Sequence, residues 1–82
     1  MELDIMREIV AEVLQVDPKE VSAESTFIDD LGADSLDLMR ILILMQEKFG
    51  VALAKNSIYK MERVSDCLEL LAECKDGQSG NY

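Results

Sequence analysis

Residues 35–49 carry the start signal, the stop signal and the apolar spacing of one uninterrupted helix. Asp34 is a typical N-cap, and Asp37, three residues later, completes an acidic version of the capping box. Gly50 is the residue type that commonly ends a helix in the left-handed conformation. In a chain of 82 residues, a helix of this length leaves room for one small domain built around it.

This predicted helix is apolar on two sides. With about 100° per residue, one side carries a core stripe made of Leu38, Leu42, Met45 and Phe49, with Ile41 at its edge. A second apolar stripe lies nearly opposite and consists of Leu36, Met39 and Ile43. Because a surface helix needs only one apolar face, the second stripe either packs under the preceding loop or forms a docking patch for other proteins. The spacing alone leaves both interpretations open.

Two further helices are predicted, together with a shorter one. The first spans about Leu3–Val16, ends at Asp17-Pro18, and carries a stripe of Ile5, Ile9, Val13 and Val16 that Met6 and Val10 widen. A short helix is expected at about Asn56–Lys60. The last helix has Ser65 as its predicted N-cap, and its inward-facing residues are Val64, Cys67, Leu68 and Leu71.

The predicted fold is all-α, a small bundle of three main helices plus one short helix. A long connection over residues 17–33 separates helices one and two, and its expected anchors are Val21, Phe27, Ile28 and Leu31. A loop of this length in so small a domain is expected to be functional. We expect the domain to cover residues 1–75 and residues 76–82 to form a flexible polar tail.

Composition excludes several classes of protein. The net charge of −9 disfavours nucleic-acid binding, because a polyanion repels phosphates. The longest apolar run, Ile41–Met45, is far too short for a membrane span, and the start of the chain lacks the features of a signal peptide. Cys67 and Cys74 are too few for a disulfide framework, which predicts a cytoplasmic protein with reduced thiols. The chain contains no His, the commonest general base and metal ligand, so we expect neither an enzyme nor a metal site.

Negative charge is concentrated in the first half of the chain. Residues 1–39 contain 11 acidic and 2 basic residues, whereas residues 40–82 contain 6 of each. A solvated face that aids solubility explains this pattern, and so does a surface that attracts basic partners. An acidic calcium loop is excluded, because residues 29–34 lack the alternating oxygen ligands of such a loop.

Ser35 is the candidate functional residue at the start of the central helix. No His or nearby Lys is present to activate it as a nucleophile, and a helix-start residue beside Asp34 would be an ordinary use of a serine. A helix N-terminus nevertheless favours an attached phosphate, through its unpaired N–H groups and the helix dipole. Ser35 therefore suits modification by another enzyme better than chemistry of its own.

Around Ser35 the sequence resembles the acyl carrier protein family over about residues 3–73. The strongest element of this resemblance is the octet Asp30-Leu31-Gly32-Ala33-Asp34-Ser35-Leu36-Asp37, which is similar to the family's phosphopantetheine attachment motif. Supporting matches are the turn at residues 14–21, the lead-in at residues 27–31 and the Glu47-Lys48-Phe49-Gly50 helix end. The resemblance implies that a phosphopantetheinyl transferase moves phosphopantetheine from coenzyme A to Ser35. The flexible arm then carries acyl groups as thioesters in fatty-acid, polyketide or specialised lipid biosynthesis.

The resemblance also implies partners and further site residues. Asp34 and Leu36 are expected to help present Ser35 for modification, and the partner-docking residues are expected to be Asp37, Met39, Arg40 and Ile43. The partners, besides the transferase, are acyl-loading enzymes, ketosynthases and other acyl-processing enzymes with basic docking surfaces, which a monomeric carrier would visit in turn. An acyl chain is expected to enter a cleft lined by Leu42, Phe49, Leu53, Ile58 and Met61.

The sequence departs from the pattern of fatty-acid carriers at two places. Arg40, with Gln46 and Lys48, makes the central helix less acidic, and Ala54-Lys55-Asn56-Ser57 replaces the usual acidic segment. These departures favour a specialised carrier. Two alternatives stay open: an aminoacyl or peptidyl carrier, which uses the same serine and arm, and a helical adaptor that binds partners without modification.

Overall fold

Three α-helices and two short 3-10 helices make up the described part of the chain. The computed structural model describes residues 2–74, and its elements are α1 (Glu2–Leu14), η1 (Pro18–Glu20), α2 (Ser35–Phe49), η2 (Lys55–Lys60) and α3 (Val64–Glu73). Between residues 2 and 74 there is no strand, and the only strand-like pairing is an isolated antiparallel bridge between Thr26 and Arg63. The predicted all-α bundle is therefore confirmed, with a 3-10 helix in place of the short fourth helix.

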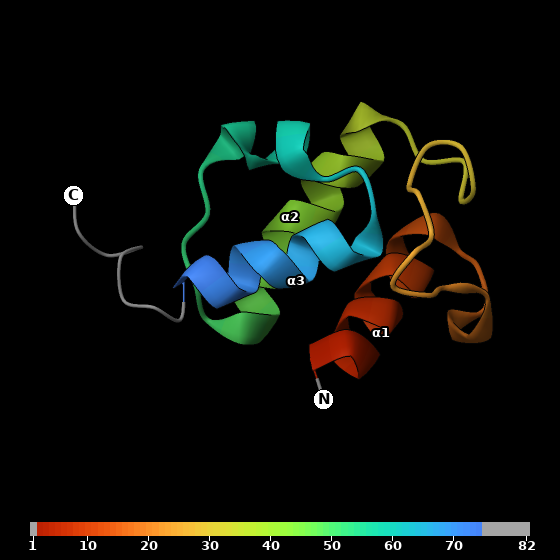
Figure 1. Cartoon of the computed structure of the whole chain (residues 1–82), viewed down its shortest axis with the longest axis horizontal. Coiled ribbons are helices and arrows are strands. Elements are labelled where there is room, and N and C mark those ends of the chain that lie inside the picture. Colours follow the sequence, from red (N-terminus) through yellow and green to blue (C-terminus); the bar gives the residue numbers. More distant parts are fainter. Residues whose placement is uncertain (1, 75–82) are drawn as a thin grey trace.

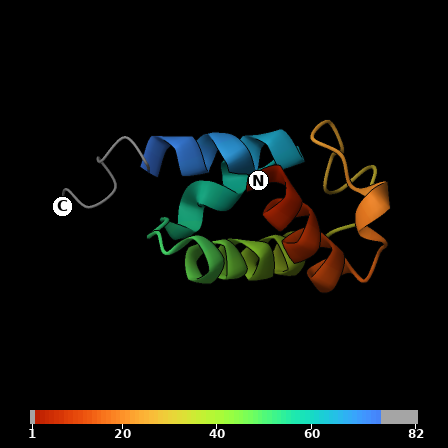
Figure 2. The same ribbon diagram turned by 90° about the horizontal axis from the view of Figure 1, so that it is seen from below.

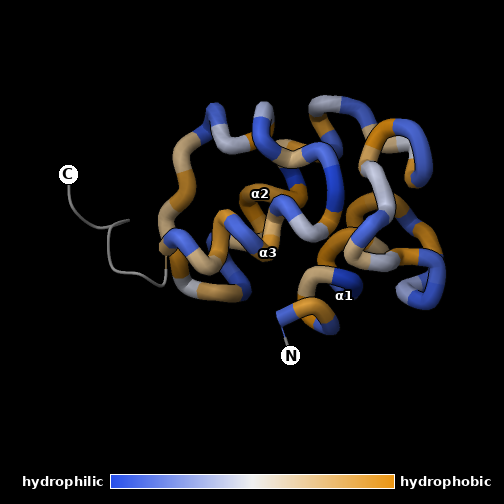
Figure 3. Tube along the Cα trace, viewed as in Figure 1, coloured by the Kyte–Doolittle hydropathy of each residue, from blue (hydrophilic) through white to orange (hydrophobic). Residues whose placement is uncertain are grey.

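The helices are arranged in layers around one core. In Figure 2, α2 and α3 form two layers, and α1 and η2 lie between them. The long segment that joins α1 to α2 forms one end of the bundle (Figure 1). Hydrophobic and hydrophilic stretches alternate along each α-helix, as expected for amphipathic helices (Figure 3). No helix within residues 2–74 is long and apolar enough to cross a membrane, and the predicted tail at residues 76–82 lies outside the described residues.

The core is built from the predicted faces of the helices, with two corrections. On α2 the buried residues are Leu38, Ile41, Leu42 and Met45, while Phe49 is half-buried. On α1 the burial is centred on Met6, Ile9 and Val10, so that Ile5, predicted to lie on the core stripe, is 37% exposed. The real stripe is rotated toward Met6 because this side of α1 faces both α2 and α3.

The first helix ends two residues earlier than predicted. Gln15 adopts the left-handed conformation, with φ of 59°. The N–H of Val16 donates to the carbonyl oxygen of Ala11 at 3.2 Å, a Schellman-type bond that ends the helix at Leu14. Val16 is therefore outside α1, although it still packs against the core.

The predicted cap of the last helix is wrong. The N-cap of α3 is Arg63, and the N3 residue Asp66 accepts hydrogen bonds from the N–H groups of Glu62 at 3.0 Å and Arg63 at 2.8 Å. The N–H of Ser65 instead donates to the carbonyl oxygen of Ala23 at 2.9 Å, so this residue belongs to a contact with the long loop. Sequence reasoning also missed Leu70, which is buried, whereas the predicted Leu68 is only half-buried.

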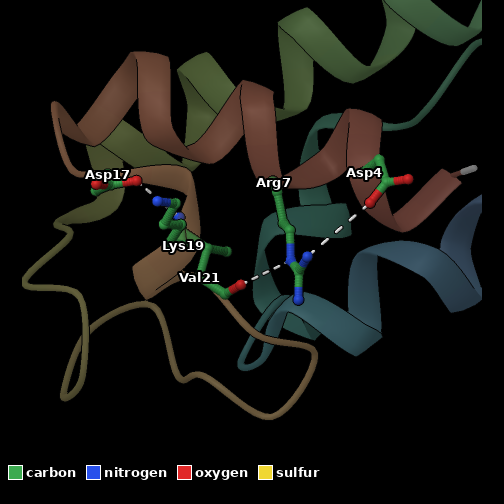
Figure 4. A network of polar contacts seen from close by, with 5 residues as sticks. All are labelled: Asp4, Arg7, Asp17, Lys19 and Val21. Atoms are coloured by element: carbon green, nitrogen blue, oxygen red, sulfur yellow. Dashed lines mark hydrogen bonds and ion pairs between the residues drawn. The ribbon is translucent and has the colours of Figure 1, made fainter.

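The long loop is fixed to the bundle at its start. Figure 4 shows Arg7 on α1 pointing to Val21, and its Nε donates to the Val21 carbonyl oxygen at 2.9 Å. The same guanidinium lies 3.9 Å from Asp4, and Asp17 accepts from the N–H of Lys19 at the start of η1. The bond from Arg7 to Val21 therefore joins the start of the loop to α1.

Of the four residues predicted to anchor the loop, two are fully buried, one is half-buried and one is exposed. Val21 and Phe27 are fully buried in the core, and Leu31 is half-buried. Ile28, predicted to anchor the loop, is 61% exposed. It points away because its neighbour Phe27 takes the inward position in this turn.

Candidate functional site

Asp34 begins the helix that carries Ser35. Its backbone is extended, with φ of −115° and ψ of −176°, and its Oδ1 accepts from the N–H of Asp37 at 2.9 Å. In return, Oδ2 of Asp37 accepts from the N–H of Asp34 at 3.3 Å. The predicted capping box is therefore confirmed, and Ser35 is the first helical residue after it.

A second reciprocal pair of hydrogen bonds shapes the turn before Ser35. The N–H of Thr26 donates to Oδ2 of Asp30 at 2.9 Å, and the N–H of Asp30 donates to Oγ1 of Thr26 at 3.0 Å. The hydrogen bonds from Thr26 lower the pKa of Asp30 below its usual value. Gly32 then adopts φ of +72°, a conformation that L side chains rarely adopt, which returns the chain toward α2.

The same turn is bound to the start of α3. The N–H of Phe27 donates to the Glu62 carbonyl oxygen at 3.0 Å, and the N–H of Val64 donates to the Ser25 carbonyl oxygen at 3.1 Å. Nη1 of Arg63 donates to the carbonyl oxygen of Glu24 at 2.8 Å. The segment that leads into Ser35 is thus held by residues about 35 positions later in the chain.

Ser35 itself is exposed, and no residue within the described range forms a hydrogen bond with its hydroxyl group. The backbone N–H groups of Ser35 and Leu36 likewise have no protein acceptor in this range. No cluster of three or more potential metal ligands occurs among residues 2–74. The geometry therefore offers an accessible hydroxyl beside two unpaired helix-start N–H groups, without a base to activate it.

The predicted docking residues lie on the outer side of α2. Leu36 is 68% exposed and Ile43 is 48% exposed, whereas Met39 is half-buried. Arg40 is exposed and forms an ion pair with Asp37, with 3.9 Å between Nη1 and Oδ1. The two apolar residues at the ends of the stripe are thus on the surface, and the loop does not cover them.

The predicted cleft residues either belong to the core cluster or pack against it. Leu42 and Met61 are buried, and the half-buried Phe49, Leu53 and Ile58 pack against the same cluster. Leu53 is held to α2 because its N–H donates to Oε1 of Gln46 at 2.9 Å.

A separate hollow of about 270 Å³ lies beside this cluster, and among its lining residues only Met61 belongs to the predicted cleft. The others are Thr26, Ile28, Asp29 and Glu62. Sequence reasoning missed this hollow because it joins segments that are distant in sequence, and no periodicity reports that proximity.

Comparison with known proteins identifies the family. The family model described as "Phosphopantetheine attachment site" matches residues 4–71. An acyl carrier protein of Solidesulfovibrio magneticus is 37% identical over 70 residues, covering 85% of this chain and 90% of that relative. An acyl carrier protein of Bdellovibrio bacteriovorus is 41% identical over 66 residues, covering 80% and 85% of the two chains.

The fold comparison agrees with the sequence comparison. A solved structure assigned as an acyl carrier protein from Mycobacterium tuberculosis has a TM-score of 0.81 at 22% identity, covering 89% of this chain and 97% of that one. The family match over residues 4–71 includes the capping box, Ser35, all of α2 and most of α1 and α3. The chain therefore belongs to the acyl carrier protein family, whose members are phosphopantetheine-bearing carriers and not enzymes.

Proposed function

We propose that Ser35 is the residue to which phosphopantetheine is attached, and that the loaded protein carries acyl groups between enzymes of a specialised pathway. One observation supports the assignment of Ser35 as the attachment site. Ser35 presents an exposed hydroxyl at the first position of α2, directly after the Asp34 cap. A modifying enzyme can reach this group without unfolding the domain.

The residues around Ser35 fit a phosphate ester. The N–H groups of Ser35 and Leu36 have no acceptor within residues 2–74, and the positive end of the helix dipole favours an anion there. The carboxylates of Asp34 and Asp37 each accept a backbone N–H in the capping box, which partly offsets their repulsion of a phosphate. When attached, the group supplies a thiol on a long arm, and the high effective concentration of its cargo near a docked enzyme aids transfer.

The outer side of α2 is the proposed docking patch, defined as Leu36, Met39 and Ile43. Exposed apolar side chains of this kind mark contact sites, and Asp37 and Arg40 flank them with charge. The excess of acidic residues before residue 40 would attract a transferase and acyl-processing enzymes with basic surfaces. This attraction raises the association rate more than the affinity.

The proposed cargo site is the cluster of Leu42, Phe49, Leu53, Ile58 and Met61 between α2 and η2. An acyl chain would enter it only if η2 moves, since Leu42 and Met61 are buried. Arg40, Lys48 and Lys55 support a specialised fatty-acid, polyketide or lipid pathway over the general one. We place the carrier, a monomer of one domain over residues 1–75, in the cytoplasm, where Cys67 and Cys74 stay reduced.

Measurement of the intact protein mass tests the attachment site. Wild type, Ser35→Ala and Ser65→Ala are incubated with coenzyme A and a broad-specificity phosphopantetheinyl transferase, and the intact masses are recorded. Ser65 lies near the start of α3 and is the matched control. We expect one added phosphopantetheine on wild type and on Ser65→Ala, and none on Ser35→Ala. Modification of Ser35→Ala, or an unmodified wild type with several transferases, would contradict the proposal.

A further inference from the structure

A second hollow lies between α1 and α2, and Ser35 is not among its lining residues. It has a volume of about 380 Å³ and is lined by Glu12, Val13, Gln15, Arg40, Ile43 and Leu44. Val13 and Leu44 are half-buried and pack against the core, so the hollow contains apolar surface. Ile43, at 48% exposure, extends this apolar surface to the outside.

The shape and the exposure of this hollow suit an inserted apolar side chain. An exposed branched side chain beside other apolar groups in a concave surface gains stability when a partner removes it from water. Ile43 also belongs to the docking patch, so the hollow continues that surface from α2 onto the end of α1. A partner that contacts Ile43 therefore reaches Val13 with the same surface.

Arg40 is the basic residue that lines the hollow, whose lining also contains the acidic Glu12. It is the only basic residue in the sequence between Lys19 and Lys48, and it is exposed at the edge of the hollow. Its ion pair with Asp37 is long, at 3.9 Å, and Asp37 also accepts the Asp34 N–H. A guanidinium has five N–H donors in a fork that matches a carboxylate, so Arg40 retains donors for a second acid.

We propose that the hollow between α1 and α2 is a docking recess for a partner enzyme that presents an apolar side chain beside a carboxylate. The apolar side chain fills the space against Val13 and Ile43, and the carboxylate binds Arg40. This inference rests on the proposed carrier function. The acidic half of the chain attracts partners with basic surfaces in general, whereas a local carboxylate at Arg40 selects among them.

The recess is tested by photo-crosslinking in the native host. A photo-crosslinking amino acid replaces Glu12, which lines the hollow, or Glu69, an exposed control residue on α3. After irradiation, the crosslinked peptides are identified by mass spectrometry. We expect position 12 alone to crosslink strongly, to a peptide with an apolar residue next to Asp or Glu.

The charge contact is then tested with the identified partner enzyme. Arg40→Glu should weaken binding by at least about fivefold, and changing the partner's carboxylate to Arg should restore it. Lys19→Glu makes the same change in charge at a residue that does not line the hollow and should alter the affinity less than about twofold.

Three results would overturn the proposal of a docking recess. They are equal crosslinking from positions 12 and 69, a crosslinked peptide without a carboxylate, or a charge swap that does not restore binding. The mass of each purified variant separates this inference from the proposed function. Crosslinking that fails in a protein carrying phosphopantetheine refutes the recess only. Absence of phosphopantetheine refutes the carrier proposal itself.

Discussion

The carboxylates near Ser35 accept hydrogen bonds that shape the backbone, and they also contribute negative charge to the surface. Asp30, Asp34 and Asp37 each accept a backbone N–H, and together they define the turn and the helix start. An acidic residue here therefore stabilises the fold locally while it contributes to the negative surface. A substitution that removes one of these acids changes both properties, so binding data alone do not separate them.

Asp30 makes the stability of the turn dependent on pH. Its pKa is lowered from about 3.8 by the hydrogen bonds with Thr26, so the ionised carboxylate favours the folded state. This contribution is complete well above the unfolded pKa and is lost as the pH falls through the folded pKa. We expect wild type to be more stable than Asp30→Asn at neutral pH, with the difference shrinking below about pH 4.

Thermal melts of both proteins from neutral to acidic pH measure this effect. Asp29→Asn removes the same charge without these bonds and should lack the pH-dependent difference. A difference between wild type and Asp30→Asn that stays constant over the whole range would contradict the role of the ionised carboxylate.

The two cysteines should differ sharply in reactivity. Cys67 is fully buried, and burial raises the pKa of its thiol to about 12, so almost no thiolate is present or accessible at pH 8. Cys74 is only half-buried at the end of α3. Iodoacetamide should therefore add one label in the native protein, at Cys74, and two in denaturant. Native labelling of Cys67, located by peptide mass, would show that the core opens readily.

At the scale of the elements, α2 has two apolar sides with different uses. Its inner side contributes Leu38, Ile41, Leu42 and Met45 to the core, and its outer side exposes Leu36 and Ile43. Leu42 and Ile43 are adjacent in sequence and similar in size, but Leu42 is buried and Ile43 is exposed. They form a matched pair for separating folding from docking.

Leu42→Ala should destabilise the fold by roughly 2–5 kcal/mol, since it leaves a cavity in a packed core. Ile43→Ala should cost within about 0.5 kcal/mol, as is usual for surface positions, and should slow modification or acyl loading instead. Denaturant unfolding of both variants gives the free energies. Equal and large losses of stability for the two would place Ile43 in the core.

The predictability of the elements follows from how local their signals are. The bounds of α2 were predicted to the residue because Asp34, Asp37 and Gly50 set them within a few positions. The start of α3 was not, because Ser65 donates to Ala23 and Asp66 takes over the capping. The prediction for Ile28 was also wrong because it depends on tertiary structure. Whether Phe27 or Ile28 turns inward is decided only when the loop packs on the core. The proposal of Ser35 as the attachment residue comes from the motif, whereas both hollows required the folded structure.

At the scale of the whole molecule, the charge is unevenly distributed along the chain. Residues 1–39 contain 11 acids and 2 bases, and these residues form α1, the long loop and the start of α2. This half of the chain includes Ser35. Under the proposed function, we therefore expect the negative charge to be concentrated in the half of the chain that a transferase approaches.

Modification of Ser35 should depend on salt. From about 0.01 M to about 1 M salt the Debye length falls from about 30 Å to about 3 Å, so long-range attraction disappears. We expect kcat/KM of a broad-specificity transferase to fall severalfold over this range. A variant with Glu8→Gln, Glu20→Gln and Glu24→Gln should start lower and converge with wild type at high salt. Identical rates for both proteins at low salt would rule out steering by these charges.

The hydrogen bonds between residues 23–27 and 62–65 have a consequence for engineered hybrid carriers. These bonds join the loop before Ser35 and the beginning of α3 into one hydrogen-bonded unit, although α2 and η2 separate the two segments in sequence. A hybrid joined within residues 50–54 would take these two segments from different parents. Arg63 reaches across the junction with its side chain, which donates to the Glu24 carbonyl oxygen, so a second parent without Arg at this position would lose that bond. Exchanging the loop together with residues 62–66 preserves the unit, so the chimera boundaries follow the hydrogen bonds and not the helix ends.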